Sequence, residues 1–457
     1  MDRARQAVFG RRSSPTEEYE PLTGDEDGTA PEASVVLENW DEIPFSWIEY
    51  GIFGFLGVAM LWAWNMFLAA APYFSSRFSS NAWIQSNFQS GILTVSTITN
   101  LSVLLILSNI QYSASYPFRI NLALIISSVI FALLTASTIV FLDASPTAYF
   151  TFLLVMVAFS SWATGLIQNG AFAFAASYGR PEYMQALMAG QGVAGVLPAV
   201  AQVTTVLLFP PKDPSLGDDN GPKQGESSAF FYFLAAVTIS VIALVVLIPL
   251  VRRHSRRIEN RIVEHMAESM TSIEEAERAA RKVTSLWVLF RKLRWLAIGL
   301  ALTFTVTMFF PVFTAKIHSV REDAGAIFRP TAFIPLGFVF WNLGDLGGRV
   351  ATMLPFSLKN RPFVMFLLAL ARVALLPLYL LCNINGKGAV VSSDFFYLFV
   401  VQLSIGLTNG WLGSSFMMAS GDWVDEGERE AAGGFMGLWL VIGLTTGSLL
   451  SFTVSGI

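Results

Sequence analysis

Residues 119–142 read RINLALIISSVIFALLTASTIVFL, and no charged side chain follows Arg119 in this stretch. A helix of about 20 such residues crosses a hydrocarbon core about 30 Å thick. Apolar runs of the same kind recur along the whole chain. Backbone groups in lipid need internal partners, and no alternating barrel pattern is present, so these runs are expected to be helices. The sequence therefore predicts an all-α, polytopic membrane protein.

The overall composition supports this prediction. Of the 457 residues, 54% are hydrophobic and 14% are charged, whereas charged residues make up about a quarter of an ordinary soluble domain. A single cysteine, Cys382, cannot form an intramolecular disulfide. The three histidines, His254, His265 and His318, do not have the spacing of metal ligands. We therefore expect no metal, no cofactor and no metalloenzyme activity.

Eleven candidate spans divide the chain into two groups. The spans are residues 48–71, 85–109, 119–142, 148–177, 183–209, 229–251, 293–315, 331–355, 362–382, 395–419 and 431–452. The predicted domains are a polar tail (1–47), a six-helix bundle (48–251), a linker loop (252–292) and a five-helix bundle (293–457). A 6+5 division suggests two bundles around a central cavity, the general plan of rocker-type carriers.

Basic residues predict the orientation in the membrane. They are concentrated in the tail, at Arg3, Arg5, Arg11 and Arg12, and again between residues 252 and 294. An even number of spans separates these segments, so both are expected in the cytosol, and eleven spans place the C-terminus in a lumen or outside the cell. The loop at 210–228 is acidic, as the opposite side permits. Residues 1–39 lack the apolar core of a signal peptide, so the first span is the expected targeting element.

A polar stripe interrupts the eighth span, at residues 338–349 (FVFWNLGDLGGR). Ionisable side chains inside a membrane are costly and therefore informative. Asp345 and Arg349 are four residues apart and share a helix face, with Asn342 one turn before them. Their donors and acceptors suit a neutral, hydroxyl-rich solute. A structural ion pair that locks two helices together is the alternative, and the two roles are compatible.

Other spans carry polar residues at membrane depth. In the first span, Trp64 and Asn65 offer an aromatic surface beside an amide. In the fourth span, Gln168 can pair in a two-pronged way with a base edge, or can hold helices together. The small residues at 188–195 (MAGQGVAG) predict close helix packing rather than binding. Arg372 is a lone cation in the ninth span, for which we expect a carbonyl or carboxylate partner in a neighbouring helix.

Seven sequence fragments follow the order and the spans of one known family. They are Trp64-Asn65 followed by Tyr73-Phe74, Gly165 with Gln168, Gly190-Gln191-Gly192 with Gly195, FTVTMFFP at 304–311, residues 342–349, RVALLPLYLLCN at 372–383, and Asn409-Gly410-Trp411-Leu412. Across residues 57–452 the chain resembles the equilibrative nucleoside transporters. It departs from the family pattern at Ala63, where proline is usual, and at Trp411, where tyrosine is common.

The resemblance implies a major-facilitator-like fold and movement of nucleosides, and sometimes nucleobases, down their gradients by alternating access. The implied substrate-binding residues are Leu61, Trp64, Asn65 and Leu68 around base and sugar, Gln168 on the base, and Asn342, Asp345 and Arg349 on base or ribose hydroxyls. The implied partners are a nucleoside and the lipid bilayer, with no nucleic acid and no obligate protein partner.

The membrane in which the chain works is suggested by its short first loop and its tail. Both are more like the fungal intracellular members of the family, and Tyr19-Glu20-Pro21-Leu22 resembles a tyrosine-based sorting signal. A vacuolar or lysosomal membrane is therefore expected rather than the plasma membrane.

Two other functions are compatible with a polytopic membrane chain that carries a buried aspartate. An intramembrane aspartyl protease needs two facing aspartates, but Asp394 and Asp422 lie at span ends. A proton-coupled carrier of another small polar solute, such as a sugar, stays open. No P-loop is visible, so transport is expected to be facilitative or weakly ion-coupled. The pairing of Asp345 with Arg349 favours a permanently charged carboxylate over a proton relay. No enzymatic activity is expected.

Overall fold

The computed structural model describes residues 44–110, 115–140, 142, 144–208, 224–268, 284–355 and 358–451, with backbone only at 224–228 and 257–268. Most of the predicted tail, including the motif at 19–22, and most of the acidic loop at 210–228 lie outside these residues. Within them the fold is helical, apart from an isolated β-bridge between Ile317 and Ile384. The all-α prediction is confirmed.

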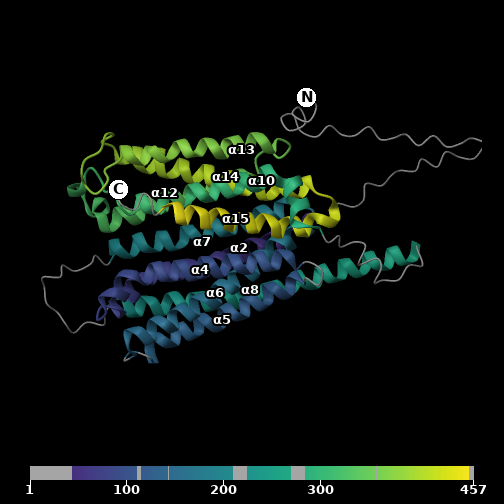
Figure 1. The fold of residues 1–457 in the computed structure, drawn as a ribbon, viewed down its shortest axis with the longest axis horizontal. Helices are drawn as coiled ribbons and strands as arrows, with labels where there is room; N and C mark the ends of the chain where they lie inside the picture. The colour runs from purple at the N-terminus through teal and green to yellow at the C-terminus, as the bar shows by residue number, and fades with distance from the viewer. Residues whose placement is uncertain are drawn as a thin grey trace, which may run out of the picture.

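The first group of helices ends with one that is longer than the predicted span. The helices are α2 (Trp47–Ala69), α3 (Ala71–Arg77), α4 (Ala82–Asn109), α5 (Tyr116–Val140), α6 (Pro146–Ser177), α7 (Pro181–Leu208) and α8 (Gln224–Glu268). Side-chain caps begin two of them: Asn81 accepts from the Ile84 amide before α4, and Ser145 from the Ala148 amide before α6. Figure 1 shows α8 continuing well beyond the other helices, because residues after 251 are charged helix formers rather than loop formers.

The second group of helices is less regular. It comprises α10 (Leu286–Thr307), α11 (Phe310–Thr314), the short 3-10 turns η1 (Glu322–Ala324) and η2 (Ala326–Phe328), α12 (Pro330–Ala351), α13 (Pro362–Ala371) with its 3-10 continuation η3 (Arg372–Leu381), the π-helix η4 (Phe396–Leu403) leading into α14 (Ser404–Ala419), η5 (Ser420–Trp423), η6 (Glu426–Glu428) and α15 (Arg429–Ser451). The predicted span 293–315 is divided into α10 and α11. Pro311 lies in the first turn of α11, where its missing N–H does least harm.

Ten helical segments of the described chain are long and apolar enough to cross a membrane. The predicted span 331–355 corresponds to α12, which is not one of the ten because its glycines and its polar stripe lower its hydropathy. Polytopic membrane architecture is thus supported, and the count of eleven spans stays a prediction.

The helices form two neighbouring groups, drawn purple to teal and green to yellow in Figure 1. Within the first group α2 packs on α7, and α5 on α6 and α8; within the second, α12 packs on α14, and α10 on α15 and α13. The groups meet where α7 contacts α12 and α14, and where α15 contacts α6 and α4. The close packing predicted for 188–195 is confirmed, since a Cβ atom on Gly190 would lie 1.9 Å from the Gly54 carbonyl oxygen of α2.

The helix bundle has two ends, and the direction of α2 distinguishes them. The proximal end is the one at which α2 and α7 begin and α12 ends, marked by Tyr183 and Thr352. The distal end is the one at which α2 ends and α11 lies.

Candidate functional site

A cavity of about 150 Å³ lies between the two groups of helices. A water molecule needs about 10–15 Å³ of such space, so the cavity has room for about ten waters or a small polar solute. Its lining residues come from α2, α4 and α6 of the first group and from α10 and α15 of the second. They are Met60, Leu61, Trp64, Phe67, Leu93, Ser96, Thr97, Asn100, Val157, Ser160, Ser161, Thr164, Gln168, Met308, Val441, Leu444, Thr445 and Ser448.

One wall of the cavity is polar and neutral. The hydroxyl of Ser161 on α6 donates to that of Ser96 on α4 at 2.8 Å, and Asn100 Nδ2 donates to Gln168 Oε1 at 3.2 Å. The α2 side contributes apolar and aromatic groups, including Trp64. None of the described lining residues is ionisable. This arrangement suits a neutral solute with one flat face and several hydrogen-bonding groups.

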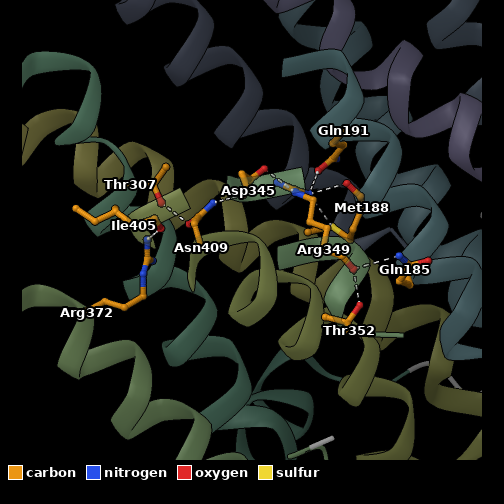
Figure 2. Close-up of polar contacts among 10 residues, drawn as sticks. All are labelled: Gln185, Met188, Gln191, Thr307, Asp345, Arg349, Thr352, Arg372, Ile405 and Asn409. Atoms are coloured by element: carbon orange, nitrogen blue, oxygen red, sulfur yellow. Dashed lines mark hydrogen bonds and ion pairs between the residues drawn. The ribbon is translucent and has the colours of Figure 1, made fainter. Parts of the chain in front are cut away.

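The predicted ion pair lies outside this cavity lining. Arg349 Nε donates to Asp345 Oδ2 at 2.7 Å, and Asn409 Nδ2 on α14 donates to Asp345 Oδ1 at 2.7 Å. Asp345 is 4% exposed and Arg349 is 5% exposed. Figure 2 shows the carboxylate between the amide and the guanidinium. The pair predicted from the i, i+4 spacing is confirmed. The second carboxylate oxygen is bonded by the Asn409 amide.

Arg349 also joins α12 to α7 at the proximal end (Figure 2). Its Nη1 donates to the Met188 carbonyl oxygen at 2.8 Å and to Gln191 Oε1 at 3.3 Å. Gln185 Nε2 in turn donates to the Arg349 carbonyl oxygen at 3.1 Å. These three contacts cross from one group of helices to the other. Arg349, Met188, Gln191 and Gln185 therefore close the proximal end, and they are called the proximal seal below.

Further polar contacts lie beside this network within the second group of helices (Figure 2). Thr307 at the end of α10 donates to Asn409 Oδ1 at 2.5 Å. Arg372 donates to the carbonyl oxygens of Thr303 at 2.9 Å and Ile405 at 3.3 Å, and to the Thr408 hydroxyl at 3.1 Å. The carbonyl partners expected for Arg372 are therefore present, on α10 and α14.

The structure brings together three of the eight predicted binding residues, Leu61, Trp64 and Gln168, in the cavity lining. Asp345 and Arg349 meet at the proximal seal instead. The role of the whole set as substrate-binding residues stays a prediction.

The other three predicted residues lie elsewhere. Asn65 Nδ2 donates to the Ala194 carbonyl oxygen at 2.6 Å and so ties α2 to α7. Leu68 is 56% exposed and does not belong to the cavity lining. Asn342 Nδ2 bonds the Phe338 carbonyl oxygen of its own helix at 2.8 Å, with its Oδ1 beside Gly195 of α7.

Sequence reasoning missed the α4 contribution to the cavity and Thr445 on α15. The spacing of Ser96, Thr97 and Asn100, within one turn of an apolar helix, is the signal that could have found the former.

Comparison with known proteins gives the family. A family model described as "Nucleoside transporter" matches residues 154–455. The chain is 29% identical to "Nucleoside transporter FUN26" of Saccharomyces cerevisiae, over 92% of this chain and 87% of that protein. It is 25% identical to the human "Equilibrative nucleoside transporter 1", over 88% of this chain and 95% of that protein.

Among solved structures, two transporters share the fold. The XylE proton:xylose symporter of the major facilitator superfamily aligns with a TM-score of 0.56 at 9% identity, covering 89% of this chain and 88% of its own. A bacterial homologue of the iron transporter ferroportin aligns at 0.54 and 14% identity, covering 90% and 92%. These likenesses show the fold alone, whereas the sequence matches show the family. The chain belongs to the nucleoside transporter family.

Proposed function

We propose that this chain is a facilitative carrier of nucleosides, or of nucleobases, that works by alternating access. The observation that carries the proposal is the neutral cavity between the two groups of helices, lined by Trp64 and Gln168. An aromatic face can stack on a base, and base–aromatic stacking is worth about 1–3 kcal/mol. An amide can bond its polar edge. The family membership, and the printed names of the relatives, point to the same substrate class.

Alternating access requires the two groups of helices to part at one end while they close at the other. The seal at the proximal end supports a state that is closed on that side. When α7 separates from α12, Arg349 loses the Met188 and Gln191 oxygens that it now binds. The guanidinium is then free to bond other acceptors, and hydroxyls of the ribose are chemically suitable. In this proposal Asn342, Asp345 and Arg349 act on the substrate after the proximal seal opens.

The same proposal includes an orientation and a location. The basic residues Arg252, Arg253 and Arg256 are exposed and flank His254, whose ring stacks on Tyr178 beside Tyr183 at the proximal end, which favours a cytosolic proximal end. The sequence similarity to a fungal relative, together with the motif at 19–22, favours an internal membrane of the vacuolar or lysosomal type. A Tyr19→Ala protein is then expected to leave that membrane, and its continued accumulation there would contradict the location.

Uptake of radiolabelled adenosine and uridine into proteoliposomes containing the purified chain tests the function. We expect saturable uptake that equilibrates without ATP and that falls in Gln168→Ala. Gln85→Ala is a matched control, because Gln85 is exposed and bonds the Ser75 carbonyl oxygen away from the cavity. Absence of uptake by correctly inserted protein would contradict the proposal.

A proton-coupled sugar carrier is the second candidate, and the same preparation separates it from the first. Excess xylose or glucose is expected to leave adenosine uptake unchanged. Strong inhibition by the sugars, with none by uridine, would favour the second candidate.

A further inference from the structure

Asn100 is a polar residue of the cavity lining. It lies on α4, in the middle of an apolar helix, and its Nδ2 donates to Gln168 Oε1 at 3.2 Å. This is the one hydrogen bond of the Asn100 side chain in the described part of the chain, where its Oδ1 is buried without a partner. Burying an unpaired amide oxygen costs about 1–3 kcal/mol. The position therefore carries a stability cost, which calls for a function.

The contact between the two amides is built into the packing of α4 on α6. Gly165 lies one turn before Gln168, and a Cβ atom there would approach Val103 Cγ1 to 2.7 Å and Asn100 Oδ1 to 3.2 Å. Only glycine therefore lets α4 come this close. The Ser161–Ser96 hydroxyl pair holds the same two helices one turn earlier in α4. The position of Asn100 opposite Gln168 is thus fixed by the helix register.

The contact decides which half of the Gln168 amide is left for a solute. A glutamine side chain offers one acceptor oxygen and one amino group that donates. Asn100 occupies the oxygen, and Gln168 Nε2 makes no hydrogen bond within the described residues. Because Gln168 lines the cavity, it presents a donor there. A solute bound by this donor must supply an acceptor.

We infer that Asn100 is a positioning residue that sets base specificity. By holding Gln168 Oε1, it keeps the amide nitrogen directed at an acceptor atom of the base, either a ring nitrogen or a carbonyl oxygen. Without Asn100 the Gln168 amide rotates freely and can bond either a donor or an acceptor of the base. This inference rests on the proposed nucleoside transport and names the interaction by which the cavity recognises the base.

The test compares adenosine with its 1-deaza, 3-deaza and 7-deaza analogues, each of which lacks one ring acceptor. Uptake efficiency for each is measured in proteoliposomes of the full-length parent, Asn100→Leu and Asn87→Leu. Asn87 is the matched control, since it is an exposed α4 asparagine whose side chain donates to the Trp83 carbonyl oxygen of its own helix. Efficiency is reported as a ratio to adenosine, which does not depend on how much protein is folded.

For the parent and Asn87→Leu we expect one analogue to be taken up about two- to tenfold less efficiently than adenosine, the effect of one neutral hydrogen bond. In Asn100→Leu the ratio is expected to move toward one, because a freely rotating amide keeps its nitrogen on that acceptor only part of the time. Gln168→Leu should bring the ratio to one, with no further change when Asn100→Leu is added. Asn100→Ala replaces Asn100→Leu if the larger side chain prevents insertion.

Two results would overturn the inference: an unchanged ratio in the Asn100 variants, or a parent that treats all three analogues like adenosine. A purely structural role for Asn100 would lower uptake of every compound equally and leave the ratio intact. A parent that takes up no adenosine would contradict the proposed function itself. That failure is distinct from normal adenosine uptake with an unchanged ratio, which would overturn only the role of Asn100.

Discussion

Replacing Asp345 with alanine is the sharpest test of the network between α7, α12 and α14. The carboxylate is buried and accepts hydrogen bonds from Arg349 and Asn409 at 2.7 Å each. Its removal deprives the Arg349 guanidinium of its counter-ion, although Arg349 is only 5% exposed to solvent. Breaking a buried ion pair in this way costs about 3–5 kcal/mol, more than the attraction between the charges alone would suggest. We therefore expect Asp345→Ala to lower the free energy of unfolding by about that amount.

Thermal unfolding of the purified protein in detergent measures this loss against an exposed pair. Lys359 Nζ lies 3.2 Å from Asp422 Oδ2, and their side chains are 48% and 38% exposed. Such pairs contribute about 0–1 kcal/mol, so Asp422→Ala should shift the unfolding temperature little. If Asp345→Ala is no less stable than Asp422→Ala, the buried network is not what holds these helices.

A double variant distinguishes an unpaired charge from a general packing defect. Apolar residues of similar volume often replace a buried ion pair at no cost in stability. Asp345→Leu with Arg349→Met is therefore expected to recover most of the stability lost in Asp345→Ala, while uptake remains impaired. A double variant less stable than the single one would refute the reasoning, because it would show that the unpaired Arg349 is not the source of the loss.

Three further substitutions have effects that follow from local contacts. Trp64→Ala is expected to raise the KM for adenosine uptake about 5- to 150-fold by removing about 1–3 kcal/mol of stacking, whereas Trp83→Ala, at a position that is 67% exposed, should not. Thr445→Val removes a cavity hydroxyl that is buried without a partner in the described chain, so it should maintain or raise the unfolding temperature while it lowers uptake. Gln402→Leu should lower the unfolding temperature, because this fully buried amide bonds three hydroxyls of the second group.

The helices of the fold were predictable because a chain that crosses lipid must satisfy its backbone hydrogen bonds internally. An uncharged run such as 120–142 must satisfy its own backbone, so its helical state follows from composition and length. The irregular segments were not predictable in this way. The 3-10 character of η3 and the π-helix η4 depend on how neighbouring helices pack and on where Pro377 falls, not on hydropathy. The part of α8 after residue 251 falls within the predicted linker, whose charged helix formers allow a solvated helix but carry no apolar signal to mark where it ends.

The candidate site was predictable to the level of helix faces. The i, i+4 spacing placed Asp345 and Arg349 together, since that spacing is a local property of one helix. Which helix that face contacts is a property of the whole fold. The sequence therefore did not reveal that Arg349 binds the Met188 carbonyl oxygen rather than lining the cavity. Asn100 was missed for the same reason, because its importance lies in Gln168 on another helix.

The division of the network between the two groups of helices bears on ion coupling. Asp345, Arg349, Asn409 and Thr307 all belong to the second group, and the network is joined to the first group by the hydrogen bonds that Arg349 and Gln185 donate. If the groups move as bodies, opening the proximal end breaks those crossing bonds and leaves the ion pair intact. Hydrogen bonds to charged groups contribute about 1.5–3 kcal/mol each, so parting α7 from α12 costs a few kcal/mol in all.

An ion pair that stays intact within one group of helices provides no step at which a proton must move with the substrate. We therefore expect adenosine uptake into proteoliposomes to proceed at the same rate whatever pH gradient is imposed, at fixed external pH. The control is a gradient collapsed with a protonophore, which should leave the rate unchanged. Uptake that rises with the gradient and falls on its collapse would mean that a proton moves with the substrate. The Asp345–Arg349 pair would then have to open during transport, contrary to the rigid-body movement inferred from its position within one group of helices.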